Sequence, residues 1–92
     1  MADAKICGLR EPAHVAAAVA AGARYLGFVF FDKSPRSVSP QEAAALTADV
    51  PAGIACVGLF VDPDDALLDR VLEVVPLDVI QLHGKELSLI HI

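Results

Sequence analysis

Two short runs of this chain combine apolar residues with side chains that can take part in catalysis. The first, residues 5–10, reads Lys-Ile-Cys-Gly-Leu-Arg and sets a thiol at the end of an apolar pattern that Gly8 ends. The second, residues 78–84, alternates so that Gln81 and His83 share one face. A thiolate can act as a base or nucleophile, and an imidazole can donate or accept a proton. If both runs are parallel strands, these groups meet at the carboxyl rim of a sheet, where α/β enzymes hold their active sites.

Each of these residues also has an interpretation without a catalytic role. Cys7 could be a small buried hydrophobic residue, as most free cysteines are. His83 could be a general acid or base, a hydrogen-bond donor to a substrate, or a structural histidine, and Gly84 beside it would let a ligand approach the backbone. Cys56 begins its apolar run at the opposite rim, so it is predicted to be a core thiol.

The polar segment 31–39 is long for a connection between a strand and a helix. Its Arg36 suits bidentate binding of a carboxylate or phosphate; the alternative is a solvated surface charge. Directly downstream, Ser39-Pro40-Gln41-Glu42 has the pattern of a helix capping box, which would fix where the segment ends. No pair of histidines or cysteines has metal-ligand spacing, and neither a GxGxxG nor a Walker sequence is present. The residues thus leave open an anion-binding loop or a solvated charge at Arg36, and give no support to a metal or dinucleotide site.

The elements that must position these residues alternate between strand and helix. Short apolar runs bounded by turn residues predict four strands, at about 4–9, 25–31, 54–61 and 79–83. Helical patterns fill the gaps, at about 12–21, 40–48 and 62–75. The third helix opens with Asp62-Pro63-Asp64-Asp65, and we take Asp62 as its N-cap. This alternation predicts βαβ units, a parallel sheet and an α/β fold.

Composition narrows the class of protein. The 92 residues are 55% hydrophobic with a mean hydropathy of +0.56, so they are predicted to form one small domain, or part of a larger one, with an apolar core. The net charge of −5 argues against nucleic acid or an anionic membrane as a partner. A small anionic substrate remains compatible with local cations such as Lys33 and Arg36. Two distant cysteines and no signal-peptide pattern favour a cytoplasmic location.

Four motifs, in this order, resemble the phosphoribosylanthranilate isomerase family of tryptophan biosynthesis. They are KICGL at 5–9, GFVFF at 27–31 followed by KSPRSVSP at 33–40, VGLFV at 57–61, and QLHG at 81–84. The resemblance covers residues 4–84. It implies a (β/α)₈ TIM barrel, of which this chain would form the N-terminal half with four parallel strands and three intervening helices.

The resemblance also implies a reaction and its residues. The family converts N-(5-phosphoribosyl)anthranilate into 1-(2-carboxyphenylamino)-1-deoxyribulose 5-phosphate by an Amadori rearrangement, without cofactor or metal. Cys7 matches the general base and Arg36 the arginine that holds the anthranilate carboxylate. Gln81 and His83 match the substrate-binding rim of the fourth strand. The family's general acid, an aspartate of a later strand, and its phosphate-binding loops have no counterpart in these 92 residues.

The chain departs from the family in its length and in its last residues. A TIM barrel takes about 200–250 residues, so residues 1–86 are expected to be half of a barrel domain. Residues 87–92 carry no helix-capping signal and are expected to be a non-native or misread tail. We expect the isolated chain to be inactive and to self-associate through its exposed sheet edges. The alternatives are a non-enzymatic, self-associating half-barrel module and a small flavodoxin-like binding domain.

Overall fold

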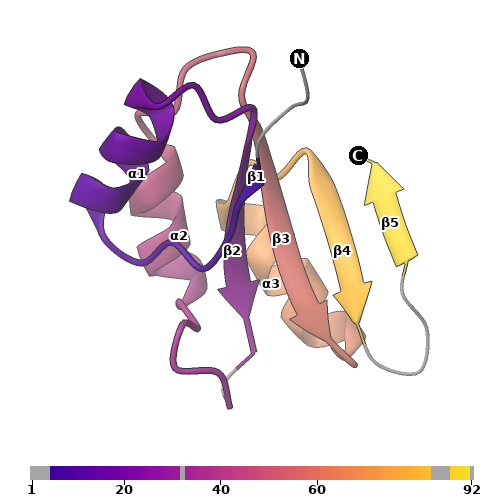
Figure 1. The fold of residues 1–92 in the computed structure, drawn as a ribbon. Helices are drawn as coiled ribbons and strands as arrows, with labels where there is room; N and C mark the ends of the chain where they lie inside the picture. Colours follow the sequence, from indigo (N-terminus) through magenta and orange to yellow (C-terminus); the bar gives the residue numbers. More distant parts are fainter. Residues whose placement is uncertain (1–4, 32, 84–87, 92) are drawn as a thin grey trace.

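The computed structural model describes residues 5–31, 33–83 and 88–91 as one sheet with three helices (Figure 1). The elements, in chain order, are β1 (Lys5–Ile6), α1 (Pro12–Ala20), β2 (Tyr25–Phe30), α2 (Pro40–Thr47), β3 (Ala55–Val61), α3 (Asp65–Val74), β4 (Val79–His83) and β5 (Ser88–His91). Strands β1 to β4 are parallel neighbours in sequential order, and β5 lies antiparallel to β4.

The sequential strand order decides between two kinds of α/β fold. In a doubly wound sheet the strand order reverses, so the first strand lies inside the sheet and helices cover both faces. Here β1 is at one edge, and the next three strands follow it in chain order. Right-handed crossovers between successive neighbours place every helix on the same face. The predicted fold, four parallel strands with three intervening helices as in half of a (β/α)₈ barrel, is confirmed.

The helices begin where local hydrogen bonds satisfy their first backbone groups. In α2 the Ser39 hydroxyl accepts from the Glu42 N–H at 3.1 Å, and the Ser39 N–H donates to the Glu42 carboxylate at 2.9 Å. This is the predicted capping box, and Pro40 occupies the first helical position, where a missing N–H costs nothing. It fixes the point at which the 31–39 segment turns into a helix.

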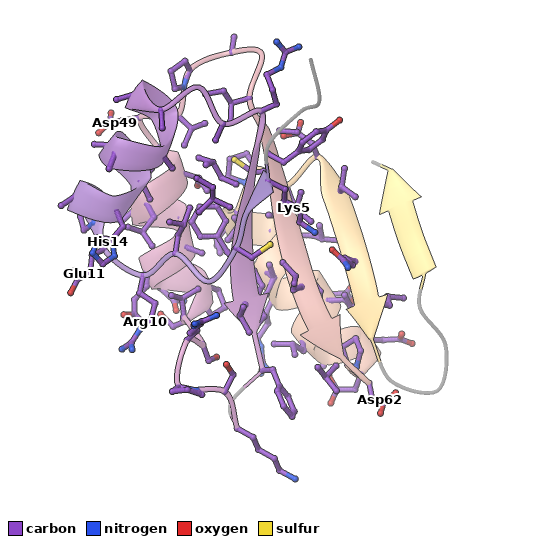
Figure 2. The ribbon with its side chains drawn as sticks, in the orientation of Figure 1. Lys5, Arg10, Glu11, His14, Asp49 and Asp62 are labelled. Carbon is purple, nitrogen blue, oxygen red and sulfur yellow. The ribbon has the colours of Figure 1, made fainter. Side chains whose placement is uncertain are left out.

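The third helix begins later than the sequence suggested. Its N-cap is Asp64, whose carboxylate accepts from the Leu67 N–H at 2.8 Å, so the assignment of Asp62 as N-cap was wrong. Asp62 has instead a positive φ of 41°, a left-handed conformation that aspartate tolerates better than most residues. The side chain of Asp62 lies at the carboxyl end of β3 (Figure 2).

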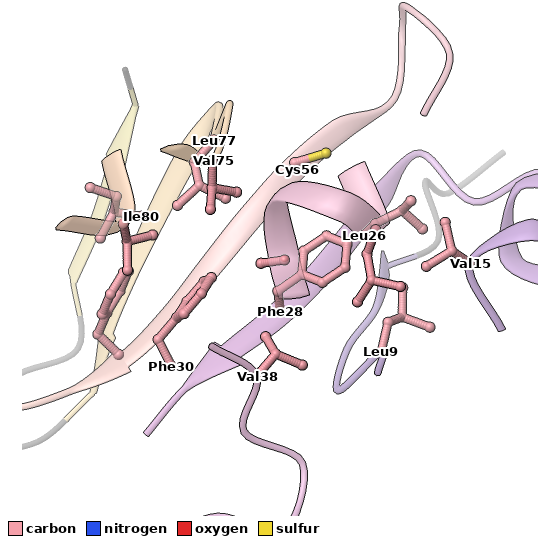
Figure 3. Packing of buried hydrophobic residues seen from close by; sticks show 14 of the residues in the cluster. Leu9, Val15, Leu26, Phe28, Phe30, Val38, Cys56, Val75, Leu77 and Ile80 are labelled. Carbon is pink, nitrogen blue, oxygen red and sulfur yellow. The ribbon is translucent and has the colours of Figure 1, made fainter. Parts of the chain in front are cut away.

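The core lies between one face of the sheet and the three helices. Sheet residues in it include Leu26 and Phe28 (Figure 3) and Phe60, all fully buried. The Phe60 ring stacks on that of Phe30 with centroids 5.2 Å apart. Each helix contributes buried residues to the same cluster: Val15 and Ala18 from α1, Ala43 and Leu46 from α2, and Val71 from α3. Sheet and helices therefore share one apolar cluster, whereas the buried Val57 and Val79 lie outside it.

The opposite face of the sheet carries the alternate residues. Ile6 and Ile80 pack against the helical core, so their neighbours Lys5 and Gln81 point to the other side. The Lys5 ammonium donates a hydrogen bond to the Gln81 side-chain oxygen. Strands β1 and β4 are three strand spacings apart, about 14 Å in a flat sheet. Side chains that stand perpendicular to the sheet meet over that span only when the sheet curves toward them, so this face is the concave, barrel-interior side.

Strand β5 was not expected from the sequence. Residues 88–91 pair with β4 from Leu82↔Ser88 to Val79↔His91, on the edge opposite β1 (Figure 1). β4 is therefore paired on both of its edges, in parallel with β3 and antiparallel with β5.

None of the helices in the described ranges is long and apolar enough to cross a membrane.

Candidate active site

The end of β1 is shaped by its pairing with β2. The strand is shorter than predicted, because the N–H groups of Gly8 and Leu9 both donate to the Gly27 carbonyl, at 3.0 and 3.3 Å. Because both N–H groups donate to one carbonyl, Gly8 and Leu9 stay next to β2 but no longer form regular strand pairing with it. Cys7 therefore has a fixed backbone, and its side chain is exposed. The interpretation of Cys7 as a buried core residue is wrong.

Glycine at position 27 makes room for the thiol. A Cβ built on Gly27 would lie 2.9 Å from the Cys7 sulfur and 3.1 Å from the Cys7 Cα. The 2.9 Å contact is closer than real Cβ atoms show, and the 3.1 Å contact, with backbone that cannot rotate away, is tighter than most. Gly27 lies between Leu26 and Phe28, which face the core, so the contact also places the Cys7 sulfur on the concave side.

The Arg36 side chain crosses the turn that follows Cys7. Gly8 has a φ of +78°, and a Cβ there would lie 2.7 Å from Arg36 Cδ and 3.5 Å from Arg36 Nε. Gly8 is thus required for two reasons, since its conformation disfavours other residues and its bare Cα forms the surface on which Arg36 rests. The predicted base and the predicted anion-binding arginine are brought together in this way, 29 positions apart in the sequence.

The two residues line one cleft. Its volume is about 460 Å³, and it is bounded by the turn after β1, by α1 and by Arg36. A larger cavity of about 710 Å³ lies between the 31–39 segment and α3 and includes Lys33, Asp62 and Arg70. That cavity contains none of Cys7, Arg36 and Gln81. The smaller cleft opens toward α1, on the helix-covered side of β1, whereas the Cys7 sulfur and Gln81 face the concave side. We therefore place the candidate site on the concave face, at the carboxyl end of β1 where Arg36 lies on Gly8.

The other two predicted site residues are on β4. Gln81 is half-buried on the concave face, where Lys5 links it to β1. His83 is the last residue of β4, at the carboxyl end of the sheet, and its side chain lies outside the described part of the structure. Lys5, which carries the contact across the sheet and is labelled in Figure 2, and Gly27 were not among the predicted site residues.

At this rim, the pKa of Glu42 depends on the capping box of α2 and on the charge of Arg10. The Ser39 backbone hydrogen bond, then that of its side chain and, to a smaller extent, the Arg10 guanidinium lower the pKa of Glu42. Arg10 is therefore close enough to the start of α2 to act on its first turn.

Within the described residues no group of three or more His, Cys, Asp or Glu side chains is arranged to hold a metal ion.

Cys56 has the core position that its place in the sequence predicted. It is 4% exposed, and burial, reinforced by the nearby Asp78 carboxylate, raises the pKa of its thiol to about 11. The Asp78 carboxylate accepts from the Cys56 N–H at 2.8 Å, and the Asp78 N–H donates to the Cys56 carbonyl. Because unfolding returns this thiol to its ordinary pKa near 9, the unfolded state loses its proton first. The fold should lose stability as the pH rises from about 9 toward 11.

The two thiols should differ sharply in reactivity. At pH 8 a thiol of pKa about 11 is a thiolate in only about one molecule in a thousand, and Cys56 is also shielded from reagents. We expect iodoacetamide at pH 8 to add one group per chain, at Cys7, and a second only after urea denaturation. Mass spectrometry of the tryptic peptides identifies the sites. Equal labelling of both cysteines in the native chain would contradict this assignment.

Comparison with known sequences identifies the relatives of this chain. Residues 4–91 match the family model described as N-(5'phosphoribosyl)anthranilate (PRA) isomerase. The chain is 72% identical over 82 residues to the N-(5'-phosphoribosyl)anthranilate isomerase of Paracoccus denitrificans (strain Pd 1222), and 61% identical over 82 residues to that of Rhodospirillum centenum (strain ATCC 51521 / SW). Each alignment covers 89% of this chain and 38% of the relative, so the chain spans well under half the length of these relatives.

Solved structures give the same result for the fold. The phosphoribosyl anthranilate isomerase of Thermotoga maritima superposes with a TM-score of 0.88 at 36% identity, over 94% of this chain and 42% of that one. A phosphoribosyl anthranilate isomerase in complex with reduced 1-(o-carboxyphenylamino)-1-deoxyribulose 5-phosphate also gives 0.88 at 36% identity, over 94% and 44% of the two chains. With the family model matching residues 4–91 and the strand order agreeing, the chain belongs to the N-(5'-phosphoribosyl)anthranilate isomerase family.

Proposed function

We propose that this chain carries the base and the carboxylate-binding side of an N-(5'-phosphoribosyl)anthranilate isomerase active site in tryptophan biosynthesis. The observation that carries the proposal is the Arg36 side chain lying on Gly8, one residue from the exposed thiol of Cys7. A cation and a candidate base are thereby held on one turn, at the carboxyl rim of a barrel sheet. That is the position from which TIM-barrel enzymes act on their substrates.

In this proposal Cys7 removes the proton from C2 of the ring-opened Schiff base. The C2–H electron pair becomes the C1–C2 double bond of an enolamine, and the electron pair of the C1–N double bond moves onto the nitrogen, which already carries its hydrogen in the iminium formed by ring opening. Tautomerisation then gives the C2 ketone, so hydrogen is redistributed within one molecule. Arg36 binds the anthranilate carboxylate through its planar guanidinium, which fixes the aromatic end of the substrate relative to Cys7. Gln81 and His83 contact the substrate from the rim of β4.

The reaction also needs an acid and an anchor for the phosphate. Ring opening requires protonation of the furanose oxygen, for which the family uses an aspartate on a later strand, and the phosphate is held by later loops. Residues 1–92 include neither. This chain covers 44% of the relative solved with a reduced deoxyribulose 5-phosphate compound, so more than half of that relative lies outside the matched segment. We therefore expect the 92-residue chain alone to be inactive.

A chimera tests the proposal. Residues 1–86 of this chain are joined to the segment of the Paracoccus denitrificans relative that follows its matched residues, and substrate consumption is followed as loss of fluorescence. The chimera should turn over N-(5'-phosphoribosyl)anthranilate, whereas the 92-residue chain should show no turnover above the buffer rate. The missing acid alone accounts for about 10²–10⁴-fold.

Two results would count against the proposal. Robust turnover by the 92-residue chain would mean that a proton donor within it supplies the acid. A chimera that folds, as judged by cooperative unfolding, and yet has no activity would mean that this chain lacks the base or the carboxylate site. The native relative serves as the positive control for substrate and assay.

Self-association is a second property that we propose for the chain by itself. β1 lies at one edge of the sheet with only two residues in regular pairing, and its other side faces no strand within the described residues. Exposed strand edges pair with other chains. Gel filtration should show a species larger than the 9.6 kDa monomer, and a monomer at all concentrations would exclude self-association.

We also propose a reducing, cytoplasmic compartment, supported by two cysteines that are both free, one exposed and one buried.

A further inference from the structure

The peptide group that joins Pro35 to Arg36 is held at both of its polar atoms. Its N–H, on Arg36, donates to the Ser34 hydroxyl at 3.1 Å. Its carbonyl, on Pro35, accepts from Nη1 of Arg10 at 2.6 Å. A peptide group is planar, so two hydrogen bonds to opposite sides fix the orientation of the whole plane. That plane sets the direction in which the Arg36 side chain leaves the backbone.

The two bonds differ in origin. Ser34 belongs to the same segment as Arg36, and that segment is also held by Ser37 N–H to Ser34 carbonyl at 3.1 Å and Val38 N–H to Val29 carbonyl at 2.9 Å. Arg10 comes from the connection between β1 and α1 and lies at the carboxyl end of the sheet, beside the start of α2 (Figure 2). A guanidinium donor makes this bond charge-assisted and stronger than a bond between neutral groups.

The same connection contacts Arg36 at a second point. Gly8, two residues before Arg10, is the surface on which the aliphatic part of Arg36 lies, with Arg36 Cδ 2.7 Å from where a Gly8 Cβ would be. The connection thus holds the Arg36 side chain through Gly8 and the Arg36 backbone through Arg10. Cys7 is attached directly to this connection, so the two contacts tie the position of the guanidinium to that of the thiol.

We propose that Arg10 is a positioning residue, which orients Arg36 toward the substrate carboxylate by holding the Pro35 carbonyl. The inference rests on the proposed function for its consequence in catalysis, and on the two hydrogen bonds of one peptide group for its structural part. The hydrogen bond of Arg10 goes to the backbone carbonyl that precedes Arg36, so in this proposal it contributes to substrate binding through Arg36.

The structural part is tested by NMR on the ¹⁵N-labelled 92-residue chain. The Nε–Hε signal of Arg36, assigned by its loss in Arg36→Lys, should have a high heteronuclear NOE in the unaltered chain and a low one in Arg10→Ala. Arg10→Lys should restore most of it, since a single N–H donor is used. Arg24→Ala removes the same charge from an exposed residue at the opposite end of β2 and should change nothing. An unchanged signal in Arg10→Ala, an equal loss in Arg24→Ala, or no recovery in Arg10→Lys would overturn the proposal.

The functional part is tested in the chimera. Because Arg36 would bind the carboxylate equally in the ground state and the transition state, Arg10→Ala should raise KM about tenfold and change kcat less than twofold. Arg10→Lys should return KM to within about threefold of the unaltered chimera. A fall in kcat with constant KM would overturn the positioning role. An inactive unaltered chimera would refute the proposed function, and the NMR result would still decide whether Arg10 orients Arg36.

Discussion

Replacing Cys7 with alanine in the chimera is expected to lower kcat/KM by about 10²–10⁴-fold, the usual contribution of a general base. The thiol is exposed, and the backbone on both sides of it is held by hydrogen bonds that do not use the side chain. The free energy of unfolding should therefore change by less than about 0.5 kcal/mol. Steady-state kinetics and urea unfolding of the same preparation measure the two effects.

The matched control is the other cysteine. Cys56→Ala removes a buried thiol, 4% exposed, and should lower the free energy of unfolding by about 1 kcal/mol while leaving turnover within about twofold. The two variants are thus expected to show opposite patterns. Near-normal turnover in Cys7→Ala would remove Cys7 as the base, whatever its effect on stability.

The second large effect concerns folding. Phe60→Ala in the 92-residue chain should lower the free energy of unfolding by about 3–5 kcal/mol. The substitution removes a ring with no exposed surface, and Phe30 loses the ring on which it stacks. Small domains have only about 5–15 kcal/mol in total, so this variant should unfold at much lower urea or be unfolded in buffer. Far-UV circular dichroism against urea concentration gives the measurement.

A leucine on the surface supplies the comparison. Leu72 is 41% exposed on α3, and Leu72→Ala should shift the free energy of unfolding by no more than about 1 kcal/mol. If both variants unfold at the same urea concentration, the helices do not pack on the sheet through the cluster that contains Phe60.

Local sequence patterns were sufficient where the structure depends on neighbouring residues. The short apolar runs at 25–31 and 54–61, bounded by turn residues, were enough to predict strands β2 and β3. The capping box at Ser39 needs only residues three apart, and it forms as predicted. The pattern by itself predicted only a parallel sheet; the sequential order of β1 to β4 was what the family resemblance implied, and the structure has it.

The errors have two different causes. Asp62 and Asp64 are both good N-cap residues, and sequence preference ranks them equally. Only the bond from the Leu67 N–H shows which one caps the helix. The contact of Arg10 with the Pro35 carbonyl depends on a loop 25 positions away, and β5 depends on the free edge that β4 has only once the parallel sheet has formed. No local pattern carries that information. For the same reason Lys5 and Gly27 could not be recognised as neighbours of Gln81 and Cys7.

The antiparallel pairing of β5 has a consequence for how this sheet can grow. The outer edge of β4 is one row of N–H and C=O groups, and such a row serves a single strand at a time. β5 occupies it from Val79 to Leu82, whereas a barrel would continue from there with a parallel strand. The hairpin-like pairing and barrel closure are therefore competing folded states of one backbone. While residues 88–91 hold that edge, they shield it from other chains, and any incoming parallel strand must first displace them.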